Sequence, residues 1–550
     1  MQRKLLFYIF LLVLIVPNVC LSVLEPMGFT AAFANVLLPL GAYLIMMSIS
    51  PKIGRTIWFM FPFVFLGAFQ IVLLSLYGRS VIAVDMFLNV ATTNSAEVSE
   101  LLGSMVPILG IIAVMYLPPL ICAIIFIKRK LYLARGFLKV NRWVGYGIAA
   151  IGMFFMVCSY IFSSNYAIKR DLYPVNALYN VYLACDRTVR TGNYYVTSDS
   201  YKYNSIPTHP SEEQEVYILI IGETSRADNW NILGYERNTN PLLSQRDDIL
   251  VSGRAMSESN TTHKSVPMLL SPVDATDFDK EIYKTKSLIT AFKEAGYATA
   301  FISNQRYNHS FIDFFGEESD TTIFVREQTD DSSFMNPTQF SDMDLLPIVD
   351  MVLAQNNRKQ LIVLHTYGSH FNYRDRYDAK YAHFKPDDYS EAMKSEREKL
   401  INAYDNTIVA TDFFIMSCIK KLESLDDTSA GLLYTSDHGE DIFDNGSSRF
   451  LHASPLPTYY QLHVPMLAWL SEVYISRYND AYEAAKKNFA ANISTSRSFC
   501  PTAINLAGIK TDKLDIRASL MSPEYEPRKI ALYLSVRNTP VRLDELIIDK

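Results

Sequence analysis

The sequence predicts an N-terminal transmembrane domain of five helices, followed by a C-terminal α/β domain of alkaline-phosphatase-like type with a mostly parallel sheet. Three observations support this division. Five long apolar stretches lie within the first 163 residues. Farther along, short runs rich in Val, Ile and Leu alternate with helical patterns, which is typical of a sheet covered by helices. The charge is divided between the two parts as well. Residues 1–165 have a formal charge of +7 and the remaining residues one of −13, which together give the net charge of −6.

This division of charge excludes a single soluble globule, because the two parts suit two different solvents. All nine histidines lie at or beyond His209. The acidic part would repel a phosphate backbone, so we expect no nucleic acid partner. A hydrophobic content of 49% excludes a disordered chain.

Each apolar stretch is long enough to cross a bilayer, which takes ~20 helical residues. Arg3 and Lys4 precede the first stretch as in a signal peptide, but four more stretches follow and no small-residue cleavage site stands out. We therefore expect a retained anchor. The five stretches run approximately over 4–24, 30–49, 56–77, 105–127 and 144–163.

The loops predict the orientation in the membrane. Ten of the eleven basic residues up to position 165 precede the first stretch or join stretches two to three and four to five. The other two loops carry four acidic residues and only Arg79 as a base. Basic loops stay in the cytoplasm, so the chain after residue 163 is predicted to lie outside it. The alternative is that one of the five stretches is a re-entrant or interfacial helix. In that case basic and acidic loops would no longer alternate between the two sides of the membrane.

A connector is predicted over 164–210. Pro174 suits the first turn of a helix, and apolar side chains recur at helical spacing over 175–185. Nearby tyrosines favour a helix at the membrane–water interface, with a linker helix packed on the soluble domain as the alternative. The domains are therefore expected over 1–163, 164–210 and 211–550.

The second part holds six candidate strands and three main candidate helices. The strands are expected over 215–222, 297–303, 360–366, 430–436, 462–469 and 529–536, and the helices over 284–295, 391–423 and 497–507. Such sheets bind ligands beyond the carboxyl ends of their strands. Carboxylates and histidines follow or flank several of these strands, without paired cysteines, which suits Zn²⁺ or Mn²⁺.

Six motifs in this order resemble those of the membrane phosphoethanolamine transferases, in the alkaline phosphatase and sulfatase superfamily. They are Gly222-Glu223-Thr224-Ser225-Arg226 continued to Pro241, Thr262-His263-Lys264-Ser265-Val266-Pro267, Leu364 to His370, Asn402 to Thr407, Ser436-Asp437-His438-Gly439-Glu440, and Leu451-His452. The resemblance spans the whole chain. It implies a multi-pass protein of the bacterial inner membrane with a periplasmic catalytic domain.

The resemblance implies that Thr262 is the nucleophile, counted back from Ser265-Val266-Pro267. On chemistry alone Thr261 is the rival. A threonine hydroxyl is a poor nucleophile at neutral pH, and coordination to Zn²⁺ favours its alkoxide.

The family's other ligands of the first zinc match Glu223, Asp437 and His438, with Thr262 as the fourth. His370 and His452 match residues that bind the donor head group, or a second zinc where one is present. Either histidine would be suited to protonating a leaving oxygen.

Asn89, Thr93 and Glu97 are spaced i, i+4, i+8 and would share one helix face. In the family this trio faces the active site and binds the donor lipid, where a carboxylate would meet an ethanolamine ammonium. A solvated polar face is the alternative.

The sequence departs from the family at several positions. Glu258 and Met268 stand where the family commonly has bridged cysteines that flank the nucleophile. The cysteines outside the membrane stretches allow at most one disulfide; they are Cys185, Cys418 and Cys500. Residues 304–309 replace a cysteine–lysine segment that contacts substrate in the family, which leaves substrate binding on that side open. His263 and Lys264 would contact an anionic acceptor or face solvent.

Together these features predict a two-step transfer by a monomer. Thr262 attacks phosphatidylethanolamine and releases diacylglycerol, and the intermediate then donates phosphoethanolamine to an outer-leaflet acceptor. Lipid A phosphate is the first candidate acceptor, and a core sugar or other glycan is the next. The added cation would weaken binding of cationic peptides such as polymyxin.

Two other functions are alternatives for this sequence. A glycerophosphate transferase of lipoteichoic-acid-synthase type with Mn²⁺ would share the five spans, but the trio from Asn89 to Glu97 and the Gly222–Arg226 motif favour the ethanolamine enzyme. A non-catalytic binding module is opposed by the retained Glu223, Thr262, Asp437 and His438.

Overall fold

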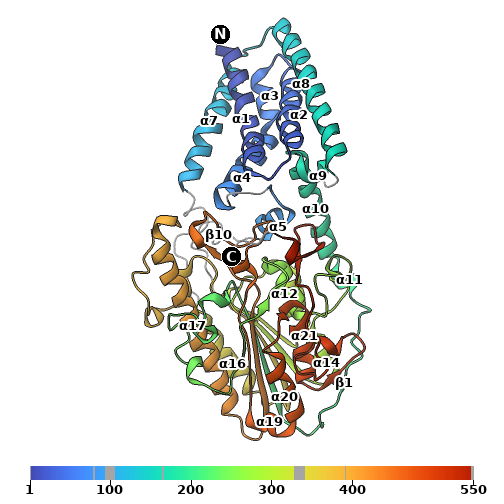
Figure 1. The fold of residues 1–550 in the computed structure, drawn as a ribbon, viewed down its shortest axis with the longest axis vertical. Helices are drawn as coiled ribbons and strands as arrows, with labels where there is room; N and C mark the ends of the chain where they lie inside the picture. The colour runs from blue at the N-terminus through green and yellow to red at the C-terminus, as the bar shows by residue number, and fades with distance from the viewer. Residues whose placement is uncertain are drawn as a thin grey trace. The chain divides into compact units, whose positions relative to one another are not determined.

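The computed structural model describes residues 2–77, 81–92, 106–163, 166–327, 341–390 and 392–546. The chain divides into two compact units (Figure 1). One consists of Met1–Leu88 and Leu102–Asp186, and the other of Asn89–Leu101 and Arg187–Lys550.

The first unit is a bundle of apolar helices. Four are long and apolar enough to cross a membrane: α1 (Gln2–Leu24), α2 (Phe29–Met47), α7 (Val106–Lys128) and α8 (Arg135–Phe162). The predicted third span is broken: α3 (Ile53–Phe59) and α4 (Phe61–Tyr77) meet at a bend of 53° and make a fifth candidate span only if they act together. Pro62 lies in the first turn of α4 and has no N–H to donate to the preceding turn, which suits a new helix start.

Both the core and the outer surface of this helix bundle are apolar. Leu12, Val114 and Phe154 expose 64%, 77% and 64% of their surface, while Phe7, Phe10 and Met47 are fully buried. Helices that are hydrophobic on every side are typical of a lipid environment. The predicted apolar helical N-terminal part is therefore confirmed.

Four shorter helices complete this region and the start of the second unit. They are α5 (Val84–Thr92), α9 (Ile168–Asp171), α10 (Val175–Gly192) and α11 (Tyr194–Thr197). α10 begins directly after Pro174, and its side chains Leu178, Tyr182 and Val189 are exposed.

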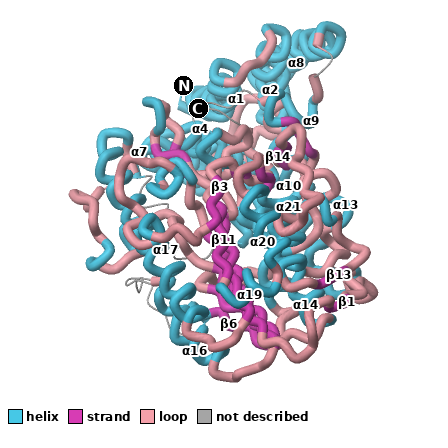
Figure 2. Tube along the Cα trace, turned by 60° about the horizontal axis from the view of Figure 1, so that its bottom comes forward, coloured by secondary structure: helices cyan, strands magenta, loops and turns pink. Residues whose placement is uncertain are grey.

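The second unit is built on a seven-stranded sheet in the order β3-β11-β8-β2-β7-β5-β6. Its strands are β2 (Glu215–Gly222), β3 (Leu250–Ser252), β5 (Ala298–Ser303), β6 (Thr321–Phe324), β7 (Lys359–His365), β8 (Ser429–Ser436) and β11 (Met466–Leu470). β11 runs antiparallel to β8 and β3, and the other pairs are parallel. Figure 2 shows the strands as one band between helices. The predicted mostly parallel sheet is confirmed.

Strand β2 explains the layering. It is buried along its whole length, with Val216, Ile218 and Ile220 in one core and Tyr217, Leu219 and Ile221 in the other. Helices α16 (Leu346–Leu353) and α17 (Arg397–Glu423) cover one face of the sheet. The opposite face is covered by α12 (Thr262–Leu270), α14 (Leu288–Glu294) and α21 (Thr495–Leu506) (Figure 1).

Smaller elements fill the edges. The short strand pairs are β1 (Ile206–Pro207) with β13 (Ile509–Lys510), β4 (Ala255–Met256) with β12 (Ile493–Ser494), β9 (Asp441–Ile442) with β10 (Phe450–Leu451), and β14 (Leu532–Leu534) with β15 (Pro540–Arg542). The remaining helices are α13 (Phe278–Glu281), α15 (Phe311–Gly316), α18 (Tyr459–Leu462), α19 (Glu472–Arg477) and α20 (Asn479–Asn488).

Four sequence predictions need correction, and the first is the helix expected from 391, which begins at Arg397. The run 529–536 supplies only the short strand β14, which pairs outside the main sheet; the residues before it, 529–531, are exposed. The strand expected over 462–469 begins at Met466, after a turn of helix that ends at Leu462. The helix expected from 284 begins at Leu288, since the Ser287 side chain accepts a hydrogen bond from the Ile289 N–H and caps it there.

Candidate metal centre

The carboxyl ends of β2, β7 and β8 meet at one edge of the sheet. Gly222 of β2 pairs with Ser436 of β8, and Ile221 pairs with His365 of β7. Glu223 therefore emerges beside Asp437, although the two are 214 positions apart in the sequence. The parallel register brings the predicted motifs to one place.

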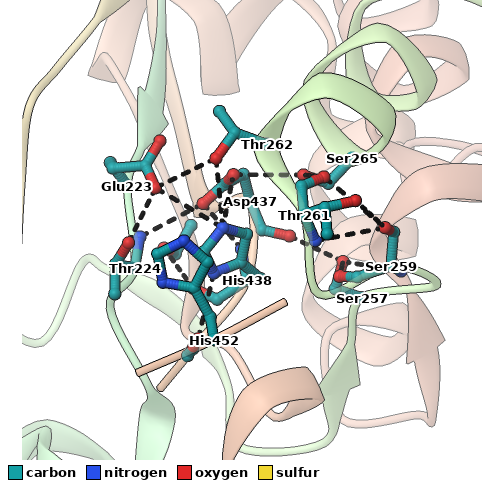
Figure 3. A network of polar contacts seen from close by, with 12 residues as sticks. Glu223, Thr224, Ser257, Ser259, Thr261, Thr262, Ser265, Asp437, His438 and His452 are labelled. Carbon is teal, nitrogen blue, oxygen red and sulfur yellow. Dashed lines mark hydrogen bonds and ion pairs between the residues drawn. The ribbon is translucent and has the colours of Figure 1, made fainter. Parts of the chain in front are cut away.

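Four predicted residues converge there (Figure 3). Thr262 Oγ1 lies 3.2 Å from Glu223 Oε1 and 3.2 Å from His438 Nε2. His438 Nε2 lies 3.4 Å from Glu223 Oε1 and 3.3 Å from Asp437 Oδ2. The ligand atoms of Glu223, Asp437 and His438 are all within 4.8 Å of one another and can hold a metal ion. These three side chains are buried, whereas Thr262 is partly open to solvent.

Thr262, rather than its neighbour Thr261, faces this cluster. Thr262 is the first residue of α12, where the helix N-terminus favours negative charge on its oxygen. Thr261 is 3% exposed, and its hydroxyl lies 3.1 Å from Ser259 Oγ on the other side of the network (Figure 3).

Burial sets the charges of the cluster. Burial, with the neighbouring Asp437 second, raises the pKa of Glu223 to about 7. Burial raises the pKa of Asp437 to about 6 and lowers the pKa of His438 to about 3. Two carboxylates and a neutral imidazole, buried together, suit a divalent cation with oxygen and nitrogen ligands.

Neighbouring donors hold the ligands in place. His438 Nδ1 lies 2.9 Å from the Gly439 carbonyl, which must accept, so Nε2 is the unprotonated atom that faces the cluster. Asp437 Oδ1 accepts from the backbone N–H groups of Thr224 and His438. Gln305 Nε2 donates to Glu223 Oε2 at 3.1 Å. Gln305 was missed as a site residue, although its position just after β5 could have indicated it.

The two predicted histidines lie beside the ligands. The His452 ring centroid lies 4.3 Å from that of His438 and 5.7 Å from that of His370. His452 Nδ1 is 2.9 Å from Glu440 Oε1. Burial disfavours the imidazolium of His452, but the Glu440 carboxylate outweighs burial and raises its pKa. Burial lowers the pKa of His370 well below the ordinary value. His452 is thus suited to carry a proton, and His370 to stay neutral.

Asp342 positions the loop that carries His370, and no sequence motif pointed to it. Its carboxylate accepts from the N–H groups of Tyr367 and Gly368, at 2.8 and 2.9 Å, and from Asn304 Nδ2. Gly368 has φ +51°, and a Cβ there would lie 2.6 Å from the Glu223 carbonyl. The close approach of this loop to Glu223 therefore requires glycine.

Glu258 ties the two flanks of α12 together where the family commonly has a disulfide. Its carboxylate accepts from the Ala275 N–H at 2.9 Å and from Ser494 Oγ at 2.7 Å. All six cysteines are free thiols. Lys264 is buried rather than solvent-facing, and its Nζ donates to the Ser535 carbonyl.

The side chains of the trio predicted to bind the donor lipid, Asn89, Thr93 and Glu97, lie outside the described structure. Asn89 belongs to the backbone of α5, but its side chain lies outside the described structure. Thr93 and Glu97 are outside the described residues altogether.

Comparison with known proteins identifies the family of the second unit. Residues 215–509, just over half of the chain, match the family model described as Sulfatase. The chain belongs to the sulfatase family. This sulfatase-family chain is 30% identical over 318 residues to Phosphoethanolamine transferase EptA of Salmonella typhimurium, covering 57% of the chain and 56% of that relative. It is 26% identical over 469 residues to Phosphatidylethanolamine transferase Mcr-2 of Escherichia coli, covering 81% and 82%.

The predicted resemblance to phosphoethanolamine transferases is therefore confirmed, although the chain spans only about half the length of the first of these relatives. The integral membrane lipooligosaccharide phosphoethanolamine transferase A of Neisseria meningitidis has the same fold, with a TM-score of 0.72, 23% identity, and coverage of 94% of this chain and 98% of that one. Apolar N-terminal helices followed by a sulfatase-type domain are thus confirmed as the fold class.

Proposed function

We propose that this chain transfers phosphoethanolamine from phosphatidylethanolamine to an anionic glycolipid, most readily a lipid A phosphate, through a covalent intermediate on Thr262. The observation that carries the proposal is the position of Thr262 Oγ1, 3.2 Å from both Glu223 and His438 at the start of α12. The names of the relatives support the donor and the acceptor class.

Zinc is the metal that the donor set fits best. Glu223, Asp437, His438 and Thr262 would hold it, since they offer carboxylate, imidazole and hydroxyl donors at one buried point. When bound, zinc supplies positive charge that stabilises the threonine alkoxide and a phosphoryl oxygen.

In the first step, Thr262 Oγ1, which has given up its proton to solvent and is present as the alkoxide, bonds to phosphorus as the bond to the diacylglycerol oxygen breaks. We assign His452 to protonate that leaving oxygen, because its Nδ1 is held by Glu440 and its Nε2 is left for the substrate. In the second step, an acceptor oxygen attacks the same phosphorus and Thr262 Oγ1 is released. The neutral His452 then takes the proton of a hydroxyl acceptor, and His370 holds the phosphodiester.

The remaining assignments belong to the same proposal. Residues 1–163 anchor the enzyme in the bacterial inner membrane, and residues 211–550 form a periplasmic catalytic domain. Residues 164–210 are the connector between these two domains. Asn89, Thr93 and Glu97 bind the donor head group. The enzyme acts as a monomer.

Diacylglycerol release from labelled phosphatidylethanolamine tests the nucleophile. We expect Thr262→Ala to abolish release and to lose the phosphoethanolamine adduct that mass spectrometry would find on the wild-type peptide containing Thr262. Thr261→Ala is the matched control and should keep both. Equal release by wild type and Thr262→Ala would reject the assignment. Lipid A masses from cells with and without the protein then identify the acceptor.

A further inference from the structure

A cavity of about 320 Å³ lies outside the metal centre, in the second unit. Four separate segments line it: 253–258, 459–463, 492–494 and 528–532. Its charged side chains are mainly basic. They are Arg254, Arg528 and Lys529, with His463 beside them and Glu258 as the one acid. Such a basic cavity stands out in a part of the chain whose balance is −13.

The negative charge near this cavity is already engaged. Glu258 accepts from Ser494 and Ala275, and lies 3.5 Å from Arg528 Nε. Arg528 also pairs with Asp274. Arg254 and Lys529 are both exposed, and within the described parts of the chain neither forms an ion pair.

Arg528 is paired with the two acids beside the cavity, Glu258 and Asp274. Its side chain is 17% exposed, and its Nε is buried without a hydrogen-bond partner in the described structure. The nearest carboxylate, that of Glu258, is 3.5 Å away. This N–H is closed off from solvent and faces Glu258, so the side chains of the lining that a ligand can reach are the exposed Arg254 and Lys529.

The cavity is joined to the nucleophile by a short piece of chain. Glu258 lines it and precedes Thr262 by four residues, so their Cα atoms are at most about 14 Å apart. Met256, also in the lining, pairs with His463 across a β-bridge. A glycan with two anionic groups can therefore place one at Thr262 and the other in the cavity.

We propose that this cavity binds a second anionic group, a phosphate or carboxylate, of the acceptor glycolipid, and so sets acceptor choice; this rests on the proposed function. The exposed Arg254 and Lys529 would pair with the anion. Guanidinium and ammonium groups bind such anions through charge-assisted hydrogen bonds.

The test uses the full-length enzyme and an acceptor with two anionic groups. We expect R254Q/K529Q to raise KM for the acceptor about 10- to 100-fold, with kcat and the unfolding temperature retained, because two charge-assisted contacts are lost. K487Q/K510Q removes the same charge from two exposed lysines outside the cavity and should change KM less than about twofold. Equal effects of the two double variants would overturn the proposal.

Two further arms identify the group that is bound. With an acceptor that lacks the second anionic group, wild type and R254Q/K529Q should have similar KM values; a persisting gap would overturn the proposal. A rise in KM for phosphatidylethanolamine instead of the acceptor would also overturn it. Calorimetry with inorganic phosphate on metal-free protein should show a binding event that R254Q/K529Q loses, even if wild type releases no diacylglycerol and the proposed function fails. Retention of that event by the variant counts against the cavity site.

Discussion

Strand β2 has a carboxylate–histidine cluster at each end. At the carboxyl end lie Glu223, Asp437 and His438, and at the amino end His209, Glu213 and Glu215. In both clusters the ligand atoms lie within 4.8 Å of one another. By distance alone, both clusters would qualify as metal sites. They differ in which groups balance the negative charge of their carboxylates.

At the amino end the protein supplies its own cation. The fully buried Glu215 accepts from Lys359 Nζ at 2.5 Å, from Tyr297 at 2.6 Å and from Tyr217 at 2.8 Å. Burial acts to raise the pKa of Glu215, but His209, Lys359 and Tyr297 together lower it. The carboxylate is satisfied without a metal.

At the carboxyl end, the side chains of the described residues that donate hydrogen bonds to the carboxylates are neutral. Thr224 and Gln305 donate to Glu223, and Ser265 lies 3.1 Å from Asp437. Among the described residues, no lysine or arginine forms an ion pair with Glu223 or Asp437, and the pKa of each is raised. The lack of a lysine or arginine partner among the described residues, rather than proximity, distinguishes the candidate metal centre.

The largest expected effect separates the two clusters by metal content. Glu223→Gln should lose bound zinc and lower kcat/KM about 10⁴-fold, or about 5 kcal/mol, because the metal site loses one of its anionic ligands. Glu215→Gln is the matched change at the other end of β2. It should keep its zinc, as measured by elemental analysis of the purified protein. Loss of zinc in both variants would contradict the prediction that only the cluster at the carboxyl end of β2 binds the metal.

A smaller effect tests the internal cation. Lys359→Met should destabilise the second unit by about 4 kcal/mol, because Glu215 would be left buried and charged. Denaturation followed by tryptophan fluorescence measures this loss. The double variant K359M/E215Q should recover most of it. If the double variant is as unstable as K359M, the ion pair is not the cause.

The smallest effect is a pH dependence of opposite sign at the two ends. In metal-free protein the pKa of Glu223 rises from 4.5 to about 7, so its contribution to stability is lost as pH rises through that range, by about 3 kcal/mol. Glu215 has a lowered pKa, so its contribution is present at neutral pH and lost as pH falls through the folded pKa. Glu223→Gln should remove the first dependence. Metal-free wild type that gains stability over Glu223→Gln between pH 5 and 7 would contradict this.

The sequence by itself determined the outline of the protein. Apolar length identified the membrane helices, and the buried run 215–222 identified the central strand, because both signals are local. The motifs after β2 and β8 already contained Glu223, Asp437 and His438, since parallel strands bring their carboxyl ends to one edge. The edge strands β3 and β6 were missed, because runs of three and four residues carry too little pattern.

Only the tertiary structure decided which charges meet. Glu440 reaches His452, Asp342 clamps the Tyr367–Gly368 loop, and Lys359 neutralises Glu215. Each partner comes from another segment of the chain, so no spacing in the sequence predicts it. Among the described residues, the same packing leaves Glu223 and Asp437 without a lysine or arginine partner, and the pKa of each is raised. Burial and the side chains that surround a carboxylate decide whether it binds a metal or a lysine, and both are properties of the folded chain.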